Sequence, residues 1–436
     1  MRYAHILMAA AAGLLALAVV MTRSAGLTVG SGVVPADERW DAILRALGGR
    51  HALFALMAVA AMWVGSRVDV RGVFGFARRL DERPMGPRSV WDQAKAAMLN
   101  PLWLMVLGSL VLVGLTFLPG VGRSVNGSSR WVAIGGFSFQ PSELLKWTMI
   151  VAIAWWCARR AGVMHRFFHG LLPPLLLIGF GVGMVIVEDL GTGVLIGAVA
   201  VAMLMAGGAR WWQVAMLIPV GAAGVIGLIV TSPYRVQRLL AFLDPWADPR
   251  GIGYHPIQSL LAFAHGGVTG TGLGNGVRKY HLPEDTTDFL FPIVAEELGL
   301  PGAALVIALI LVILWVGLGI VTRCRDAFSR LLGLGVLLTI GGQAVMNIAV
   351  VTVVVPTKGI ALPLLSAGGT GWCVTGFMLG LVASLDNAAA LEEGAAERAA
   401  EEAESRRRRT ERVRVRVAEN RTRPRLLDPV REGHAA

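Results

Sequence analysis

Charged residues are scarce in this chain. Of its 436 residues only 16% are Asp, Glu, Lys or Arg, whereas 55% are hydrophobic, and the mean hydropathy is +0.62. Soluble domains carry roughly 25% charged residues. This composition excludes an ordinary water-soluble protein and predicts a core embedded in a membrane.

Cysteines are few and cofactor motifs are missing. Cys157, Cys324 and Cys373 do not make a disulfide framework, and all three lie in or beside apolar runs, where packing is the expected role. The sequence has no P-loop, no dinucleotide fingerprint and no zinc-ligand spacing. It therefore carries no signature of an ATP-driven pump and indicates no cofactor; a divalent cation such as Mg²⁺ is left open.

Long apolar runs, in contrast, are abundant. A spanning helix needs about 20 mostly apolar residues, and ten runs approach or reach this length. The predicted fold class is all-α: a ten-helix membrane domain at 1–386, then a charged cytoplasmic tail at 387–436 that is helical at first and largely disordered after that. The predicted spans are 6–20, 52–64, 102–118, 144–158, 171–187, 194–206, 214–230, 304–321, 331–355 and 370–385. The first run also fits a signal peptide, since Arg2 precedes it and small residues follow it.

The basic residues indicate an orientation. The net charge is +11, and arginines and lysines concentrate in the connections at 67–95, 159–166 and 323–330. Because such loops face the cytoplasm, both termini are predicted inside, and the large loop at 231–288 between helices 7 and 8 is predicted outside. The charge therefore does not indicate a nucleic-acid partner, and the arginine-rich tail is expected to contact solvent or lipid headgroups.

Polar residues gather at the predicted outer side of the spans. Glu143 and Lys146 begin the fourth span, Asp189 lies between the fifth and sixth, and Lys358 lies in the ninth loop. Ionisable residues at membrane depth indicate function by default. A buried pair such as Glu143 with Lys146 also serves to lock two helices together, and both interpretations stand at this stage.

The 231–288 loop carries carboxylates next to cations. Lys279 precedes Glu284, and Asp288 lies where the chain returns to the membrane. Glycosyl transfer from a diphosphate leaving group needs a carboxylate that accepts the proton of the acceptor hydroxyl and a positive charge that neutralises the diphosphate. Asp288 is the candidate base; the alternative is that it caps the helix that follows. Glu296 and Glu297 precede Gly299 and Pro301, which predicts a short helix, a break and then the eighth span.

Five ordered blocks between about residues 100 and 386 resemble the SEDS (shape, elongation, division, sporulation) family of peptidoglycan glycosyltransferases, with wording more FtsW-like than RodA-like. Two departures are Glu188, where the family has proline, and Ser-Ala-Gly-Gly-Thr at 366–370, where it has Ser-Tyr-Gly-Gly-Ser. The matching blocks are 126–131 with 139–146, 189–192, 234–249, 282–289 with 296–299, and 356–363.

The resemblance implies a substrate and roles. It implies polymerisation of lipid II into undecaprenyl-diphosphate-linked glycan at the bacterial inner membrane, for septal wall synthesis in cell division. Its implied roles are catalytic carboxylate for Asp288, diphosphate contacts for Lys358, Arg130 and Lys279, sugar contacts for Trp131 and Glu284, and site support for Glu143, Lys146 and Asp189.

The resemblance also implies partners. They are a class B penicillin-binding transpeptidase, other divisome proteins, the growing glycan strand and membrane lipids. The chain has no Ser-x-x-Lys motif of penicillin-binding enzymes, so crosslinking has to come from such a partner. Gly317 and Gly319 in the apolar eighth span are predicted to admit the partner's single helix; the alternative is that they pack inside the bundle.

Three other functions remain in competition. A lipid II flippase is expected to carry its charges near the midplane, in broken helices of two related halves, whereas here they gather on one side and no such repeat is found. A non-catalytic scaffold predicts that the loop carboxylates are dispensable. A RodA-like polymerase for sidewall elongation shares the chemistry and differs in cellular role.

Overall fold

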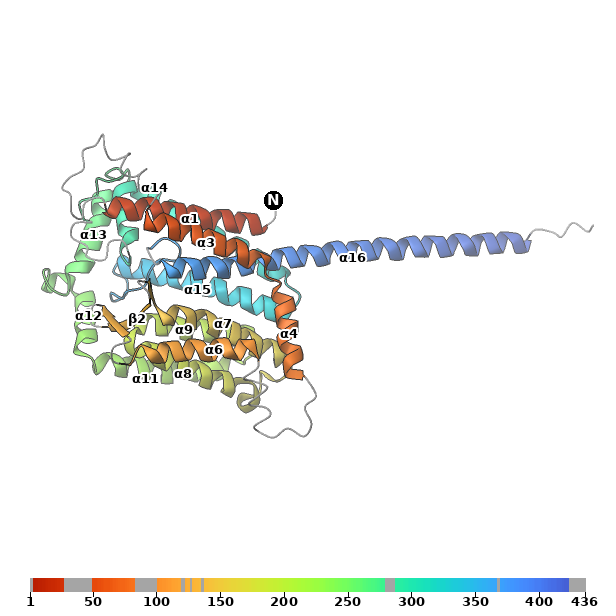
Figure 1. Ribbon diagram of the computed structural model, residues 1–436, viewed down its shortest axis with the longest axis horizontal. Helices are drawn as coiled ribbons and strands as arrows, with labels where there is room; N and C mark the ends of the chain where they lie inside the picture. Colours follow the sequence, from red (N-terminus) through yellow and green to blue (C-terminus); the bar gives the residue numbers. More distant parts are fainter. Residues whose placement is uncertain are drawn as a thin grey trace, which may run out of the picture. The chain divides into compact units, whose positions relative to one another are not determined.

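The computed structural model describes residues 3–26, 49–82, 100–118, 122–125, 128–134, 137–278, 287–366 and 369–422. The chain divides into two compact units, Met1–Asn387 and Ala388–Ala436. The first unit is a bundle of helices (Figure 1). The predicted all-α class is confirmed by these helices.

Most elements of the first unit are helices that run side by side (Figure 1). In lipid, a helix satisfies its own backbone hydrogen bonds, which favours this arrangement. The helices are α1 (Tyr3–Gly26), α3 (Arg50–Arg67), α4 (Val70–Glu82), α6 (Pro101–Leu115), α7 (Pro141–Arg159), α8 (Leu172–Glu188), α9 (Leu190–Ala206), α10 (Trp211–Ala215), α11 (Leu217–Val230), α12 (Pro233–Leu243), α13 (Tyr254–Gly266), α14 (Leu290–Arg323), α15 (Ala327–Val351) and α16 (Thr370–Thr422), which continues into the second unit.

The helices make this a multi-pass membrane protein. Among the described residues, five helices are long and apolar enough to cross a membrane, or six when Arg50–Arg67 and Val70–Phe76 count as one bent span. Pro101–Leu115 and Leu190–Ala206 are shorter apolar helices. The count of ten spans stays a prediction, as does the disorder of the tail, where α16 is helical to Thr422 and the residues beyond it lie outside the described ranges.

A short sheet, which the sequence did not predict, precedes α7. Strands β1 (Gly122–Val125), β2 (Ser128–Ile134) and β3 (Phe137–Phe139) pair antiparallel in the order β1-β2-β3. Arg123 lies opposite Trp131, and Ala133 lies opposite Ser138. The sheet packs on α7 and α8.

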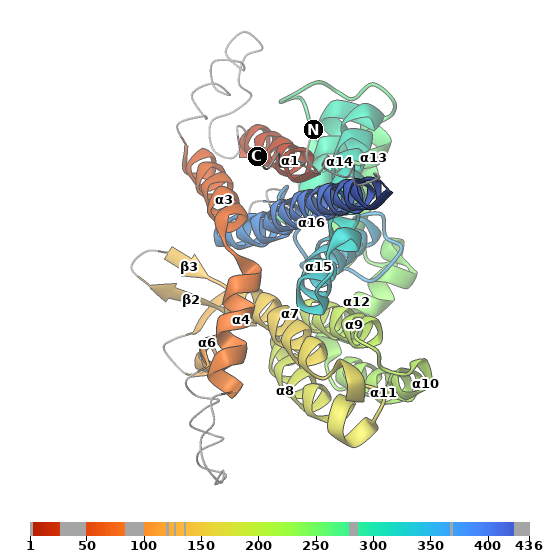
Figure 2. The same ribbon diagram turned by 90° about the vertical axis from the view of Figure 1, so that its right-hand side faces the viewer.

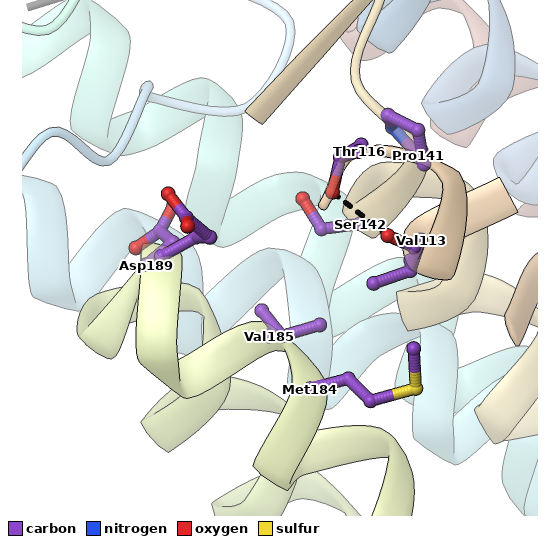
Figure 3. A pocket seen from close by; sticks show the side chains of 8 residues that line it. Val113, Thr116, Pro141, Ser142, Met184, Val185 and Asp189 are labelled. Atoms are coloured by element: carbon purple, nitrogen blue, oxygen red, sulfur yellow. Dashed lines mark hydrogen bonds between the residues drawn. The ribbon is translucent and has the colours of Figure 1, made fainter. Parts of the chain in front are cut away.

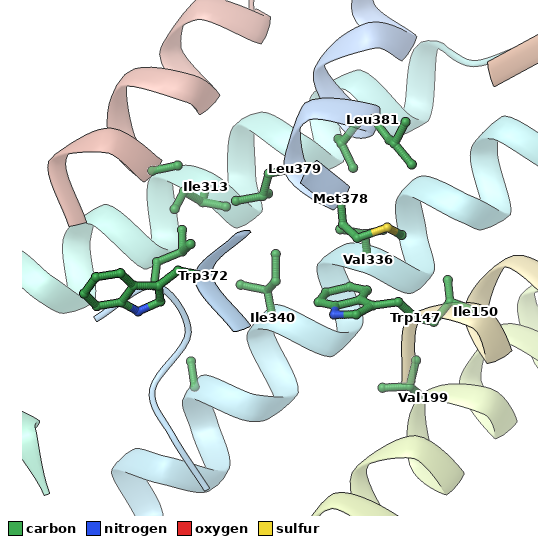
Figure 4. Packing of buried hydrophobic residues seen from close by; sticks show 14 of the residues in the cluster. Trp147, Ile150, Val199, Ile313, Val336, Ile340, Trp372, Met378, Leu379 and Leu381 are labelled. Carbon is green, nitrogen blue, oxygen red and sulfur yellow. The ribbon is translucent and has the colours of Figure 1, made fainter. Parts of the chain in front are cut away.

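Helix α15 lies between α14 on one side and α7 and α9 on the other (Figure 2). Its buried residues Val336 and Ile340 pack with Trp147 of α7 and with Met378 of α16 in one apolar core (Figure 4). This core fixes α7 and the first part of α16 relative to α15.

The predicted break before the eighth span is confirmed. Gly299 interrupts α14 with φ 67° and ψ −160°, a conformation that is essentially restricted to glycine. A Cβ at this position would meet the backbone nitrogen of Gly270 at 2.4 Å. The break turns the first two turns of α14, Leu290 to Leu298, toward the loop that follows α13.

The prediction that Gly317 and Gly319 form an open docking face is wrong. Gly317 is buried, and a Cβ there would meet Leu337 Cδ2 of α15 at 2.5 Å. A Cβ at Gly319 would meet the ring of Tyr3 in α1 at 3.5 Å. These glycines permit close helix packing inside the bundle, while the exposed side of α14 carries Leu311, Trp315 and Leu318.

The two ends of the bundle differ in content. Helices α12 and α13 and strand β2 lie at one end, and α4 lies at the other (Figure 1). At the α4 end, Arg71 Nε lies 3.1 Å from Asp326 Oδ1. The Arg323 guanidinium lies 4.4 Å above the Tyr3 ring centre and 3.8 Å from Asp386.

Candidate active site

Asp288 lies at the α12 and α13 end of the bundle, immediately before α14. Its backbone oxygen accepts a hydrogen bond of 2.9 Å from Asn347 Nδ2 of α15. The ring of the next residue, the buried Phe289, stacks on His255 of α13 at 5.7 Å between ring centres. Phe289, not Asp288, occupies the N-cap position of α14, and no side chain caps it. Asp288 therefore does not hold the N-cap position itself, and a role of its carboxylate at this helix end stays a prediction.

The loop that carries Lys358 is held by side chains of two helices. The second contact of Asn347 Nδ2, at 2.6 Å, is to the Ile360 oxygen. Gln343 Nε2, one turn earlier in α15, donates to the Ala361 oxygen at 2.8 Å. From α12, Arg238 Nη1 donates to the Thr357 oxygen at 3.2 Å. The carbonyls around Lys358 are thereby fixed to the bundle.

Lys358 lies over the first turn of α9. A Cβ added at Gly191 would meet Ile360 Cδ1 at 2.7 Å and Lys358 Cδ at 3.4 Å, so the glycine leaves room for the Ile360 side chain of this loop. Burial lowers the pKa of the Lys358 ammonium from its ordinary value, nearby Asp189 opposes this, and Arg235 and Arg238 add to it. The site thus places a partly desolvated cation among other cations, which suits binding of an anion.

Asp189 fixes the start of α9, the helix over which Lys358 lies. Its Oδ1 accepts from Thr192 N at 3.0 Å, and its Oδ2 accepts from the Thr192 hydroxyl at 2.9 Å, so it caps α9. Arg235 of α12 donates to the Val187 oxygen at 2.6 Å, next to the end of α8. Both residues fix the ends of helices around Lys358.

Glu143 and Lys146 form a buried network rather than a binding surface. Lys146 is 2% exposed, and its Nζ lies 2.8 Å from Glu143 Oε2 and 2.9 Å from Gln343 Oε1. The network joins α7 to α15, and Gln343 carries it on to the Lys358 loop. These contacts favour the helix-locking interpretation that the sequence left open.

The other predicted site residues are not brought to Asp288 by described contacts. Trp131 lies in β2, which packs on α7 and α8, and is partly buried. Arg130 is its neighbour in the same strand. Lys279 and Glu284 lie outside the described residues, so their predicted roles stay predictions.

Glu296 and Glu297 organise the loop that leads toward Lys279. Both are buried, at 0% and 1% exposed. Glu296 Oε1 accepts from Val277 N at 3.0 Å and from Arg278 N at 3.2 Å. Glu297 Oε2 accepts from Gly274 N at 3.0 Å and from the Ser24 hydroxyl of α1 at 2.5 Å. The broken end of α14 thus holds the glycine-rich loop in place.

Sequence reasoning missed Gln343, Asn347, Arg235 and Arg238 as parts of the site. A signal for the two amides was present, because they are polar residues four positions apart within an apolar span. Attention to charged residues alone left them out.

Two cavities lie near these elements. The smaller, about 20 Å³, lies between α6, α7 and α8 and is lined by residues that include Thr116, Ser142 and Asp189 (Figure 3); this is room for one water molecule. The larger is an apolar groove of about 510 Å³ between α9, α14 and α15. In the described part of the chain, no three His, Cys, Asp or Glu side chains gather as metal ligands would.

Comparison with known proteins gives the family. The model of the cell cycle protein family of FtsW, RodA and SpoVE matches residues 94–390. A protein of Geobacter metallireducens named probable peptidoglycan glycosyltransferase FtsW is 35% identical over 76% of this chain and 83% of its own length. A Nitrosococcus halophilus protein with the same name is 42% identical over 65% of this chain and 74% of its own length.

Solved structures give the same fold. A chain from a structure titled "Structural coordination of polymerization and crosslinking by a peptidoglycan synthase complex" aligns with a TM-score of 0.64 at 24% identity, over 88% of this chain and 97% of that one. The rod shape determining protein RodA of Thermus thermophilus aligns with a TM-score of 0.55 at 22% identity, over 87% and 95%.

The fold and the family match define a class of multi-pass helical membrane proteins, the cell cycle proteins. This chain belongs to the FtsW/RodA/SpoVE family. The predicted resemblance, more FtsW-like than RodA-like, is confirmed by the names of the relatives.

Proposed function

We propose that this chain is a peptidoglycan glycosyltransferase that polymerises lipid II in division-associated wall synthesis. One observation carries the proposal: the amide of Asn347 joins the backbone of Asp288 to the loop of Lys358, at 2.9 and 2.6 Å. Two segments that carry a carboxylate and a cation, and that are joined at the end of a membrane bundle, suit a sugar donor with a lipid diphosphate leaving group.

In the proposed reaction, Asp288 accepts the proton from the 4-hydroxyl of the GlcNAc of an incoming lipid II. The hydroxyl oxygen forms a bond to the anomeric carbon of the terminal MurNAc of the growing strand. The bond from that carbon to the diphosphate oxygen breaks, and its electron pair leaves on undecaprenyl diphosphate. Attack opposite the leaving group inverts the configuration, and Lys358 neutralises the diphosphate.

The basic residues at the two ends of the bundle indicate its orientation in the membrane. Helix α4, which carries Arg71, lies at the end opposite α12 and α13 (Figure 1). Arg323 is the last residue of α14, the helix that begins just after Asp288. Under the positive-inside rule the α4 end faces the cytoplasm, so we infer that both termini are cytoplasmic and that the site opens on the outer face of the bacterial inner membrane.

The proposed partner is a class B penicillin-binding transpeptidase with a single membrane helix. The solved complex that shares this fold is titled as coordinating polymerization with crosslinking. Leu318 of α14, which is 48% exposed, lines the apolar groove between α9, α14 and α15, and Trp315 of the same helix is 75% exposed. An apolar helix of the partner fits this face.

The test replaces Asp288 by Asn. Labelled lipid II is given to the purified full chain with its transpeptidase partner, and the glycan products are separated on a gel. Loss of a general base typically costs about 10²- to 10⁴-fold, so Asp288→Asn should stop polymerisation. The control, Glu404→Gln, lies on the exposed tail helix and should polymerise normally.

The same variants separate an enzyme from a flippase. A flippase predicts that Asp288→Asn abolishes transbilayer movement of a fluorescent lipid II in vesicles and that the wild-type chain makes no polymer. If Asp288→Asn polymerises at the wild-type rate, Asp288 is not the base, and Glu284 becomes the next candidate.

A further inference from the structure

Asn347 is a buried amide that contacts two chain segments far apart in sequence. Its Nδ2 lies 2.9 Å from the Asp288 oxygen and 2.6 Å from the Ile360 oxygen, and the residue is 1% exposed. We propose that Asn347 is a positioning residue that sets the relative position of the Asp288 backbone and the Lys358 loop. This inference rests on the proposed function, because it concerns the two groups to which that function assigns the chemistry.

The amide matches its two acceptors in number and kind. A primary amide nitrogen carries two hydrogens, and each is donated to one carbonyl. Since only the NH₂ end donates, the two carbonyls also fix which way the amide points. The Oδ1 end is buried and meets no donor among the described residues. Asn347 thus has one orientation that serves both segments.

The contact to Ile360 is buried and the contact to Asp288 is partly buried. A buried carbonyl that loses its donor pays a desolvation cost, so loss of the amide weakens both segments at once. Gln343 and Arg238 continue to hold the Ala361 and Thr357 carbonyls of the Lys358 loop. The two segments are separated by about 70 positions in the sequence. A single substitution at Asn347 that changes both of them is therefore not expected from local effects along the chain.

Gln343 provides a contrast one turn earlier on the same helix. Its amide donates to the Ala361 oxygen of the Lys358 loop and accepts from Lys146, and neither bond reaches Asp288. Thr339 provides a control, because its buried hydroxyl donates to the Gly335 oxygen of its own helix at 2.8 Å. On α15, Asn347 therefore holds both segments, Gln343 holds only the Lys358 loop, and Thr339 holds neither.

The experiment compares Asn347→Leu, Asn347→Asp, Gln343→Leu and Thr339→Val in the purified full chain. Hydrogen exchange by mass spectrometry is followed for the amides of 287–291 and 357–362. In both Asn347 variants we expect exchange to quicken by roughly tenfold in both segments, in Gln343→Leu only in 357–362, and in Thr339→Val in neither. Unchanged exchange in α1 and α6 serves as the folding check.

Asn347→Asp keeps the side chain's shape and replaces the donor by an acceptor that faces two carbonyl oxygens, so it separates hydrogen bonding from packing. With labelled lipid II, kcat should fall at least tenfold in both Asn347 variants, because the base and the cation loop are displaced relative to each other.

The outcomes divide clearly. If exchange quickens in one segment or in neither, or if kcat is unchanged while both segments quicken, the positioning role is wrong. If the wild-type chain makes no polymer and Asp288→Asn changes nothing, the proposed function is wrong, and the exchange result still decides whether Asn347 joins the two segments.

Discussion

The free-energy cost of removing the buried Glu296 side chain follows from its hydrogen bonds. It accepts from two backbone N–H groups of the glycine-rich loop, Val277 at 3.0 Å and Arg278 at 3.2 Å. A hydrogen bond to a charged group contributes about 1.5–3 kcal/mol. This part of the loop is partly exposed, so in Glu296→Ala water replaces part of the lost hydrogen-bond energy. We therefore take about 3 kcal/mol as the net loss for the two hydrogen bonds together. This corresponds to about a hundredfold shift from the held to the released loop.

Glu296→Ala should therefore quicken amide exchange at 274–278 and lower polymerisation at least tenfold, with insertion into the membrane unchanged. Glu296→Gln retains one acceptor oxygen and should give an intermediate result. Both are measured with labelled lipid II and hydrogen exchange, with Glu404→Gln as the exposed control. Wild-type exchange at 274–278 in Glu296→Ala would refute the reasoning, because the loop would then not depend on this carboxylate.

Three further predictions concern the cation, the partner and the packing of the bundle. Because burial lowers the pKa of Lys358, its charge is lost at lower pH than that of an exposed lysine; polymerisation should decline on the alkaline side below about pH 10.5, and Lys358→Arg should move that decline to higher pH. Leu318→Ala with Trp315→Ala should lower co-purification of the transpeptidase several-fold, whereas the equally exposed Val220→Ala on α11 should not. Gly317→Leu should destabilise the bundle instead, since Leu337 occupies the space.

Local sequence patterns predicted the helices better than they predicted the tertiary contacts between them. Most of the apolar runs lie within helices, although those at 102–118 and 331–355 continue past the ends of α6 and α15, and that at 214–230 is divided between α10 and α11. The break before the eighth span falls at Gly299, because glycine followed by proline determines backbone geometry within a few residues. The sheet at 122–139 was missed because its strands have only four, seven and three residues. Such short strands leave little alternation to detect.

The contact partners depend on tertiary packing, which a single sequence does not give. The eighth span is apolar around its whole circumference, so composition did not distinguish the side of Gly317, which faces α15, from the side of Trp315, which is exposed. Asp288 and Lys358 were selected correctly as residues of one end, yet Asn347, which joins their segments, became visible only when the backbone was placed.

Three positions on α15, spaced four residues apart, contact the segments that carry the proposed site and hold them in place. Gln343 holds the Ala361 carbonyl, Asn347 holds the Ile360 and Asp288 carbonyls, and the Val351 carbonyl accepts from the Ser259 hydroxyl of α13 at 2.5 Å. Residues four apart lie on one helix face at a rise of about 6 Å. The helix therefore fixes three separate segments at the α12 and α13 end of the bundle. Because α15 packs between α14, α7 and α9, its own position is fixed by the bundle, and the proposed site takes its geometry from these packed helices.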